Sequence, residues 1–201
     1  MSCSNDAEEL TKAGFPYTAE EVAEQFLGVA LVEMLEMIER DHGRPLPPGF
    51  LQHLKETTTA RFDAELAAVE GVGGMLELLD LPRCVASSSD LARLHHSLGL
   101  VGLLDQLPPH IYSADQVARG KPEPDLFLHA AEAMDHAPDR CLVIEDSLAG
   151  VAAGRAAGMT VLGFVGASHI PLGHDERLRE AGAHKVFDSM ADLSSLIDAF
   201  A

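Results

Sequence analysis

Two adjacent carboxylates, Glu145 and Asp146, directly follow the apolar run Leu142-Val143-Ile144. Small residues come next, and a helical pattern then closes at Gly158. An apolar run, a polar end and a helix in this order are typical of a buried parallel strand whose carboxyl end carries chemistry. Carboxylate oxygens on a tight turn suit Mg²⁺, which proteins usually hold with carboxylates, water and a substrate phosphate. We therefore predict that Glu145 and Asp146 bind Mg²⁺; the alternative is that both acids are solvated and stabilise a helix N-terminus.

Polar residues also follow two earlier segments of the chain. The triple serine Ser87-Ser88-Ser89 ends a predicted strand, and Lys121 lies in the turn Gly120-Lys121-Pro122. Each feature alone is common, because serine runs form turns and such lysines are usually solvated in surface loops. In an open parallel sheet, however, the carboxyl ends of neighbouring strands line one crevice. Serine hydroxyls and the N–H groups that open the next helix suit a phosphate, whose charge Lys121 would offset. With the two acids, these residues predict the electrostatic half of a phosphoryl-transfer site.

The elements that must position these residues change in type after Gly71. Before it, Thr18 and Glu21 form a capping box, and apolar residues recur at helical spacing from Leu31 to Ile38. After it, short apolar segments alternate with helical patterns, which indicates parallel βαβ units. We therefore expect an α/β fold with a small helical cap in residues 1–70 and a core in residues 71–201. Helices are predicted over residues 10–15, 18–26, 31–42, 50–66, 72–79, 91–98, 125–134, 151–157 and 191–200, and strands over 83–86, 110–113, 142–144, 160–164 and 185–187.

Composition bounds the class of protein. The 201 residues are 47% hydrophobic and carry 14 Lys and Arg against 32 Asp and Glu, a formal net charge of -18. So acidic a chain is a poor candidate for binding nucleic acid or an anionic membrane surface. No apolar run is long enough to span a bilayer, and residues 1–20 lack a signal-peptide pattern. Cys3, Cys84 and Cys141, the last two in predicted buried strands, indicate free thiols in a reducing compartment, so we expect a cytoplasmic protein.

In this order and after predicted strands, the motifs resemble those of the haloacid dehalogenase (HAD) superfamily. The turn from Gly120 to Asp125 and the run from Val143 to Val151, which continues through Ala156-Ala157-Gly158-Met159, resemble the branch that contains phosphoglycolate phosphatase and β-phosphoglucomutase. The resemblance implies a HAD-like Rossmannoid parallel sheet with a small all-helical cap. It also implies a Mg²⁺-dependent phosphatase or phosphomutase that acts on a small phosphorylated metabolite through an aspartyl-phosphate.

The resemblance implies roles position by position. Ser87 would hydrogen-bond the transferring phosphoryl group, with the Ser88 backbone beside it. Lys121 would bridge the phosphate and the nucleophile. Glu145 and Asp146 would bind Mg²⁺ directly or through water.

The cap is expected to contribute less than in relatives. Gly28 would lie on the cap loop that faces the substrate. Many relatives carry arginine or another polar residue just after this glycine, whereas Val29 and Ala30 stand here. A cap contact to the substrate is therefore expected to be missing. Asp90 stands where some mutases carry a lysine, which weakens the expectation of a second phosphate contact.

The family's first motif, a strand that ends in Asp-x-Asp-Gly, does not occur in this sequence. The resemblance gives its aspartates the roles of nucleophile and general acid/base, and we assign neither role to Asp6, which follows no predicted strand. That strand would lie centrally, between the predicted strands 83–86 and 142–144. Its loss would leave two backbone ladders unpaired. We therefore expect a truncated version of an active enzyme or a divergent form, and no turnover by the 201 residues alone.

Several functions stay open. Phosphatase and mutase are equally compatible with the motifs, and a HAD-like protein that only binds a phosphorylated ligand or partner is the alternative. Haloacid dehalogenation needs no metal, and phosphonate cleavage needs a cap lysine such as Lys12 or Lys55, so both fit less well. We expect a monomer or homodimer, with self-association through exposed sheet edges as a further option. The ten histidines, His169 and His174 among them, lack metal-ligand spacing and are expected to be surface or structural residues.

Overall fold

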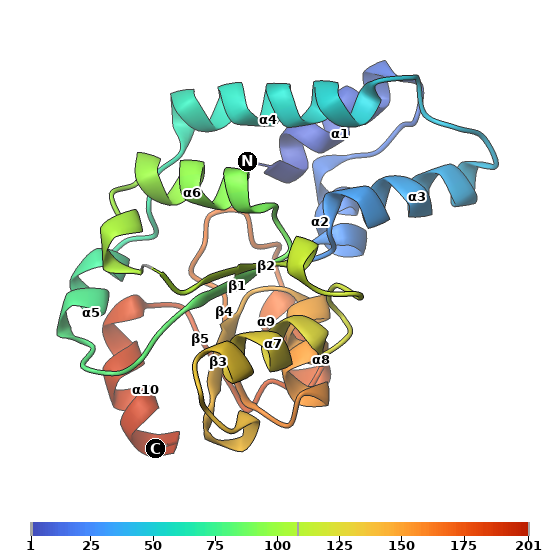
Figure 1. Ribbon diagram of the computed structural model, residues 1–201. Coiled ribbons are helices and arrows are strands. Elements are labelled where there is room, and N and C mark those ends of the chain that lie inside the picture. The colour runs from blue at the N-terminus through green and yellow to red at the C-terminus, as the bar shows by residue number, and fades with distance from the viewer. Residues whose placement is uncertain (1, 108, 201) are drawn as a thin grey trace.

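The computed structural model describes residues 2–107 and 109–200 (Figure 1). Its first part is helical, as predicted, and the blue and cyan helices gather in the upper part of Figure 1. The division into a cap of residues 1–70 and a core of residues 71–201 stays a prediction. The first four helices are α1 (Ser2–Lys12), α2 (Ala19–Phe26), α3 (Leu31–His42) and α4 (Phe50–Glu65).

The ends of α2 and α3 follow from local sequence. Thr18 Oγ1 accepts a hydrogen bond from the Glu21 N–H (3.1 Å), while Glu21 Oε2 accepts one from the Thr18 N–H (2.7 Å). This is the predicted capping box, and it begins α2. Gly43 ends α3 in the left-handed conformation, with φ 63°.

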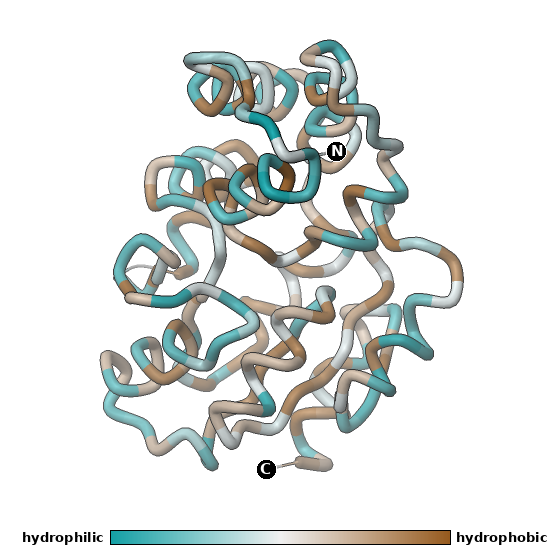
Figure 2. The backbone as a smooth tube through the Cα atoms, turned by 90° about the vertical axis from the view of Figure 1, so that its right-hand side faces the viewer, coloured by the Kyte–Doolittle hydropathy of each residue, from teal (hydrophilic) through white to brown (hydrophobic). Residues whose placement is uncertain are grey.

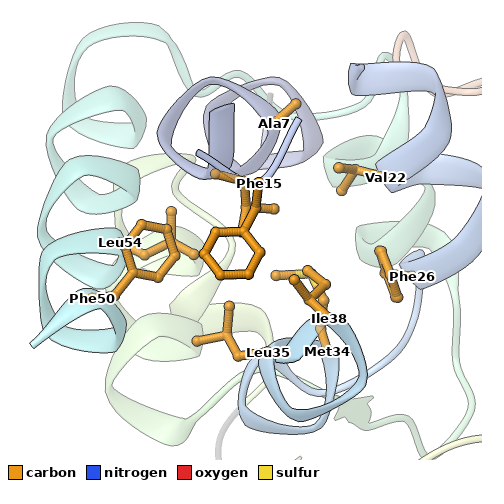
Figure 3. Packing of buried hydrophobic residues seen from close by; sticks show 10 residues of the cluster. Ala7, Phe15, Val22, Phe26, Met34, Leu35, Ile38, Phe50 and Leu54 are labelled. Atoms are coloured by element: carbon orange, nitrogen blue, oxygen red, sulfur yellow. The ribbon is translucent and has the colours of Figure 1, made fainter. Parts of the chain in front are cut away.

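One apolar cluster holds these four helices together. Figure 3 shows the ring of Phe15 at its centre, with Leu54 of α4 on one side and Ile38 of α3 on the other. All three side chains are fully buried. The guanidinium carbon of Arg44 lies 3.9 Å from the centroid of the Phe15 ring, a cation–π contact. The other buried members are Ala7, Leu10, Val22, Phe26, Met34, Leu35 and Phe50.

The rest of the chain alternates short strands with helices, as predicted. The strands are β1 (Val85–Ser87), β2 (Ile111–Ser113), β3 (Leu142–Glu145), β4 (Thr160–Phe164) and β5 (Lys185–Phe187). The helices are α5 (Val72–Leu78), α6 (Leu91–Leu100), α7 (Asp125–Ala133), α8 (Leu148–Ala156), α9 (His174–Glu180) and α10 (Leu193–Phe200). Short 3₁₀ turns lie at η1 (Leu104–Gln106), η2 (Ala114–Gln116), η3 (Pro138–Arg140) and η4 (Met190–Asp192).

All strand pairs are parallel, but the sheet is divided in two. β1 pairs with β2 in a register that opposes Val85 to Ile111 and Ser87 to Ser113. β4 lies between β3 and β5 in a second, three-stranded sheet. Within residues 2–107 and 109–200, no ladder joins β1 to β3. The two strands whose carboxyl ends carry most of the predicted site therefore belong to different sheets.

Adjacent residues of β4 pack on opposite faces of the three-stranded sheet. Val161 joins a cluster with Val151 of α8 and Leu178 of α9, whereas Leu162 joins one with Leu193 of α10. Because side chains alternate along a strand, α8 and α9 cover one face and α10 covers the other. Figure 2 shows hydrophobic and hydrophilic residues alternating around the helices, as expected for elements with one face on a core.

Some sequence-based details were wrong. The helix expected to stop at Gly99 continues to Leu100, and Gly102 takes the left-handed φ, 70°, instead. Helix α9 was not predicted, because its seven residues are mostly charged and show no apolar stripe. Cys84 and Cys141 lie just before β1 and β3 and are half-buried, rather than inside buried strands. In the part of the chain that the structure describes, no helix is both long and apolar enough to cross a bilayer.

Candidate active site

A cavity of about 940 Å³ opens between the helices of the first part and the carboxyl ends of β1 and β3. Its walls combine distant parts of the chain: α1, α4, the loop between α2 and α3, and the segments that follow β1, β2 and β3. All residues predicted for the site line it, although their roles in binding stay predictions: Gly28, Ser87, Ser88, Lys121, Glu145 and Asp146.

Lys121 is a buried cation in the cavity wall, with a side chain only 5% exposed. Its Nζ donates to the Ala86 carbonyl oxygen at 3.1 Å and forms an ion pair with Glu145. The ammonium group also lies 4.7 Å from the centroid of the Phe127 ring, a cation–π contact. Since Ala86 belongs to β1 and Glu145 ends β3, the lysine bridges the two sheets. A phosphate in the cavity would meet a cation held at a fixed point.

Glu145 turns its carboxylate onto the N-terminus of α8. Oε1 pairs with Lys121, while Oε2 accepts hydrogen bonds from the N–H groups of Asp146 and Ser147, both at 3.1 Å. The Ser147 hydroxyl donates to the same oxygen at 2.8 Å. A helix N-terminus and charge-assisted bonds both favour an ionised carboxylate. Gly150 makes this position possible, because a Cβ there would collide with the Glu145 carboxylate.

Asp146 is held by two histidines from the segment after β4. Its Oδ2 lies 3.0 Å from His169 Nε2, and its carbonyl oxygen accepts a hydrogen bond from His174 Nε2 at 2.7 Å. Burial would raise the pKa of the Asp146 carboxyl, but the His169 bond and the positive charges of His169 and Lys121 lower it below its ordinary value. The side chain is 36% exposed, so this carboxylate stays accessible from the cavity.

The serine loop is fixed by its own hydrogen bonds. Ser87 Oγ accepts from the Ser89 N–H at 3.2 Å, and Ser88 Oγ donates to the Gly28 carbonyl oxygen at 2.5 Å. The fully buried Ser113 donates to the Ser89 carbonyl oxygen at 2.8 Å. These bonds hold the loop against β2 and against the helical part. The Ser87 hydroxyl keeps its proton available for a phosphate oxygen, because it acts as an acceptor in its local bond.

Gly28 is the residue at which the helical part contacts both the serine loop after β1 and the loop after β3. Its φ is +86°, and a Cβ there would lie 2.6 Å from Ser147 Cβ. Its carbonyl oxygen receives the Ser88 bond. Only glycine combines this backbone conformation with so close an approach. Val29 and Ala30, which follow it, line the cavity with apolar side chains, and the missing cap contact stays a prediction.

The donor chemistry of the two acids fits a hard divalent cation. Glu145 and Asp146 offer two carboxylates at one end of the cavity, and Mg²⁺ is commonly held by one or two carboxylates with water and phosphate oxygens. Among residues 2–107 and 109–200, however, no group of three or more His, Cys, Asp or Glu side chains converges as ligands. Glu145 is already bonded to Lys121 and Ser147, so Asp146 carries the more accessible oxygens. Substrate or water would have to complete the shell.

Four residues in or near the cavity are not marked as site residues by any pattern in the sequence. His169 and His174 reach Asp146 from 23 and 28 residues away, so their spacing does not mark them as neighbours of an acid. Arg93 and Asp6 line the part of the cavity formed by helices, on α6 and α1. Burial raises the pKa of the Asp6 carboxyl to about 6, against the opposing charge of Arg93. Asp6 follows no strand, as expected, and it is a buried residue of the cavity wall.

Known proteins are similar to this chain in sequence. Residues 19–158 match the family of haloacid dehalogenase-like hydrolases. The chain is 36% identical over 157 residues to 6-phosphogluconate phosphatase of Escherichia coli, covering 78% of this chain and 71% of that protein. It is 31% identical over 168 residues to β-phosphoglucomutase of Mycobacterium bovis, covering 83% of this chain but 56% of that protein.

The fold is shared as well. The crystal structure of a conserved haloacid dehalogenase-like protein of unknown function from Agrobacterium tumefaciens matches with a TM-score of 0.83 at 39% identity. The match covers 98% of this chain and 90% of that one, so it includes both the helical part and the α/β part. This chain belongs to the haloacid dehalogenase-like hydrolases, and its named relatives include a phosphatase and a phosphomutase.

Proposed function

We propose that this protein binds the phosphate group of a small phosphorylated metabolite in the cavity beside Lys121. The observation that carries the proposal is the buried Lys121–Glu145 pair next to the accessible Asp146 carboxylate. A cation, two acids and a serine loop at the carboxyl ends of parallel strands form the electrostatic part of a phosphoryl-transfer site. The relatives named as phosphatases and phosphomutases support this chemistry.

Each side chain then has a definite task. Lys121 neutralises charge on the phosphate, the Ser87 hydroxyl donates to a phosphate oxygen, and the Ser88 backbone lies beside it. Glu145 and Asp146 would hold Mg²⁺, which supplies positive charge to the phosphoryl group when bound. Gly28 brings the helical part over the substrate.

No Asp-x-Asp, the motif expected to carry the nucleophile, occurs among the 201 residues. We propose that these residues bind a phosphate monoester without forming an aspartyl-phosphate, and that turnover needs the missing motif. The second candidate, a protein that only binds a phosphorylated ligand, makes the same prediction for this chain. Phosphatase and phosphomutase remain equal alternatives for the complete reaction. The three free thiols favour a reducing compartment such as the cytoplasm.

A binding and turnover experiment tests the proposal. Calorimetry measures the affinity for 6-phosphogluconate, for glucose 1-phosphate and for inorganic phosphate, with and without Mg²⁺, and a phosphate-release assay measures turnover. We expect binding of the monoesters, tighter with Mg²⁺, and no release of phosphate. Lys121→Ala should abolish binding, whereas Lys185→Ala, at an exposed position on β5, should leave it unchanged. Equal affinities of the two variants, or no binding by folded protein, would reject the function.

A further inference from the structure

Arg93 lies where α1, α4 and α6 meet at the cavity, in the part formed by helices rather than by strand ends. Its guanidinium carbon lies 5.0 Å from the centroid of the Phe62 ring of α4. One nitrogen, Nη2, donates to the Ser2 hydroxyl of α1 at 3.0 Å. The ring contact and the hydrogen bond together restrain the guanidinium. The remaining N–H groups of a planar fork are thereby held in a defined direction.

The charge of Arg93 is compensated at a distance, by Asp6 and Asp90. Burial lowers the pKa of its guanidinium, although an arginine remains charged at any ordinary pH. In the described part of the chain, no carboxylate lies within ion-pair distance of this guanidinium. The two lysines of the cavity wall differ from Arg93 because each has a direct carboxylate partner. Lys55 pairs with Asp90 at 2.9 Å, and Lys121 pairs with Glu145.

Nearby acids do not take over this role. Asp90 caps α6 by accepting from the Arg93 backbone N–H at 2.9 Å, and its other oxygen pairs with Lys55. Asp6 accepts from the Ser2 hydroxyl at 3.3 Å and contacts Arg93 through that hydroxyl rather than directly. A partly buried cation without a direct carboxylate partner is costly unless a ligand completes it. The site therefore suits an anion that enters with the substrate.

We propose that Arg93 binds a carboxylate at the end of the substrate remote from its phosphate group. The inference rests on the proposed function, because it takes the phosphate to lie beside Lys121. A fork of parallel N–H groups matches a carboxylate in two-point geometry. Arg93 offers one positive charge, and the acids Asp6 and Asp90 lie nearby. A ligand group with one negative charge is therefore favoured over a second phosphate. A cavity of about 940 Å³ is far larger than a phosphate group requires. The substrate class is then a phosphorylated sugar acid or a similar phosphorylated hydroxy acid.

The test compares two ligands that differ only at the remote end. 6-Phosphogluconate ends in a carboxylate, and sorbitol 6-phosphate has a neutral hydroxymethyl group in its place. Calorimetry on the wild-type chain should give an affinity for 6-phosphogluconate that is higher by about tenfold or more, as for a charged hydrogen-bonded pair. Arg93→Gln should reduce this ratio to about one while leaving the sorbitol 6-phosphate affinity unchanged, and Arg93→Lys should give an intermediate ratio. Sorbitol 1,6-bisphosphate should bind less tightly than 6-phosphogluconate.

Controls separate this inference from the proposed function. Arg179→Gln, at a half-exposed position on α9, should change neither affinity. Lys121→Ala should abolish the binding of both ligands, because both carry the phosphate. If wild-type protein binds the two ligands equally, or if Arg93→Gln weakens them equally, the carboxylate site is rejected and the phosphate site stands. Should neither ligand bind to folded wild-type protein, the proposed function fails and the inference fails with it. If Arg93→Gln does not fold, the intermediate ratio expected for Arg93→Lys decides the question, and a ratio unchanged from wild type rejects the carboxylate site at Arg93.

Discussion

The ammonium group of Lys121 pairs with the carboxylate of Glu145 and, through a 3.1 Å bond to the Ala86 carbonyl oxygen, ties β3 to β1. These two strands belong to different sheets. The pair is buried, with side chains 5% and 9% exposed. One interaction therefore serves both the proposed phosphate site and the connection between the two halves of the α/β part.

Removing one member of this pair should strongly destabilise the protein. Lys121→Ala leaves the Glu145 carboxylate buried without its cation, which typically costs about 3–5 kcal/mol. Urea unfolding followed by circular dichroism measures the change. Lys121→Met combined with Glu145→Leu should recover most of the loss, because both charges are then absent. A loss of less than about 1 kcal/mol in the single variant, the value typical of a surface pair, would contradict the buried ion pair.

Gly150 should not tolerate a larger residue. In Gly150→Ala the new Cβ would collide with the Glu145 carboxylate, so either α8 or the carboxylate has to move. We expect a loss of about 2 kcal/mol or more in unfolding free energy, in the range for overpacking. Gly74→Ala is the matched control, since Gly74 lies within helix α5 and a Cβ there meets nothing within 4 Å. That substitution should be neutral or stabilise by about 0.5–1 kcal/mol. Equal effects of the two changes would show that Gly150 is not a packing constraint.

The free energy of unfolding should fall as the pH rises from 3.8 to about 6, the range over which the Asp6 carboxyl loses its proton in the unfolded and then in the folded protein. Burial raises the pKa of this carboxyl from 3.8 to about 6 in the folded protein. Between these values the folded state binds a proton that the unfolded state has released, so stability decreases with increasing pH. Asp6→Asn should flatten this dependence and raise the unfolding free energy above pH 6 by up to about 3 kcal/mol. Urea unfolding at pH 4.5, 5.5 and 7.5 measures it. The control Asp198→Asn, at an exposed position on α10, should keep the wild-type slope.

His169 should control the ionisation of Asp146. The hydrogen bond from His169 lowers the pKa of the Asp146 carboxyl against the effect of burial. His169→Ala removes both the bond and the positive charge, so the pKa should rise. Carbon-13 NMR of the Asp146 carboxyl during an acid titration measures the shift. His95→Ala, at an exposed position on α6, serves as the control. An unchanged Asp146 titration in His169→Ala would mean that the 3.0 Å contact has no energetic weight.

The sequence allows the strand ends of this site to be predicted, but not its helical wall. Ser87, Lys121, Glu145 and Asp146 could be placed together because parallel strands bring their carboxyl ends to one edge. That rule needs only the order of strands along the chain. Arg93 and Asp6 come together through the packing of α6 against α1 and α4, which depends on side-chain shapes in three helices. His169 reaches Asp146 from a segment without regular structure, whose path no periodic pattern describes.

The division of the sheet predicts self-association. Within residues 2–107 and 109–200, β1 pairs only with β2, and β3 pairs only with β4, so each has one edge without a neighbouring strand. Unpaired strand edges are templates for pairing with another chain. Ile144 of β3 is 39% exposed, an unusual state for a large apolar residue in a parallel strand. We expect dimers or larger species whose fraction grows with concentration, measured by sedimentation equilibrium.

A lysine on this strand should oppose the association. Ile144→Lys places a charge beside the unpaired edge and should weaken the dimer by about tenfold or more, which corresponds to about 1.4 kcal/mol. Leu128→Lys is the matched control, because Leu128 on α7 is equally exposed at 39% but belongs to a helix. If both substitutions weaken association equally, general surface hydrophobicity rather than strand pairing drives it. A monomer at every concentration would mean that the two edges are shielded in solution by the side chains around them.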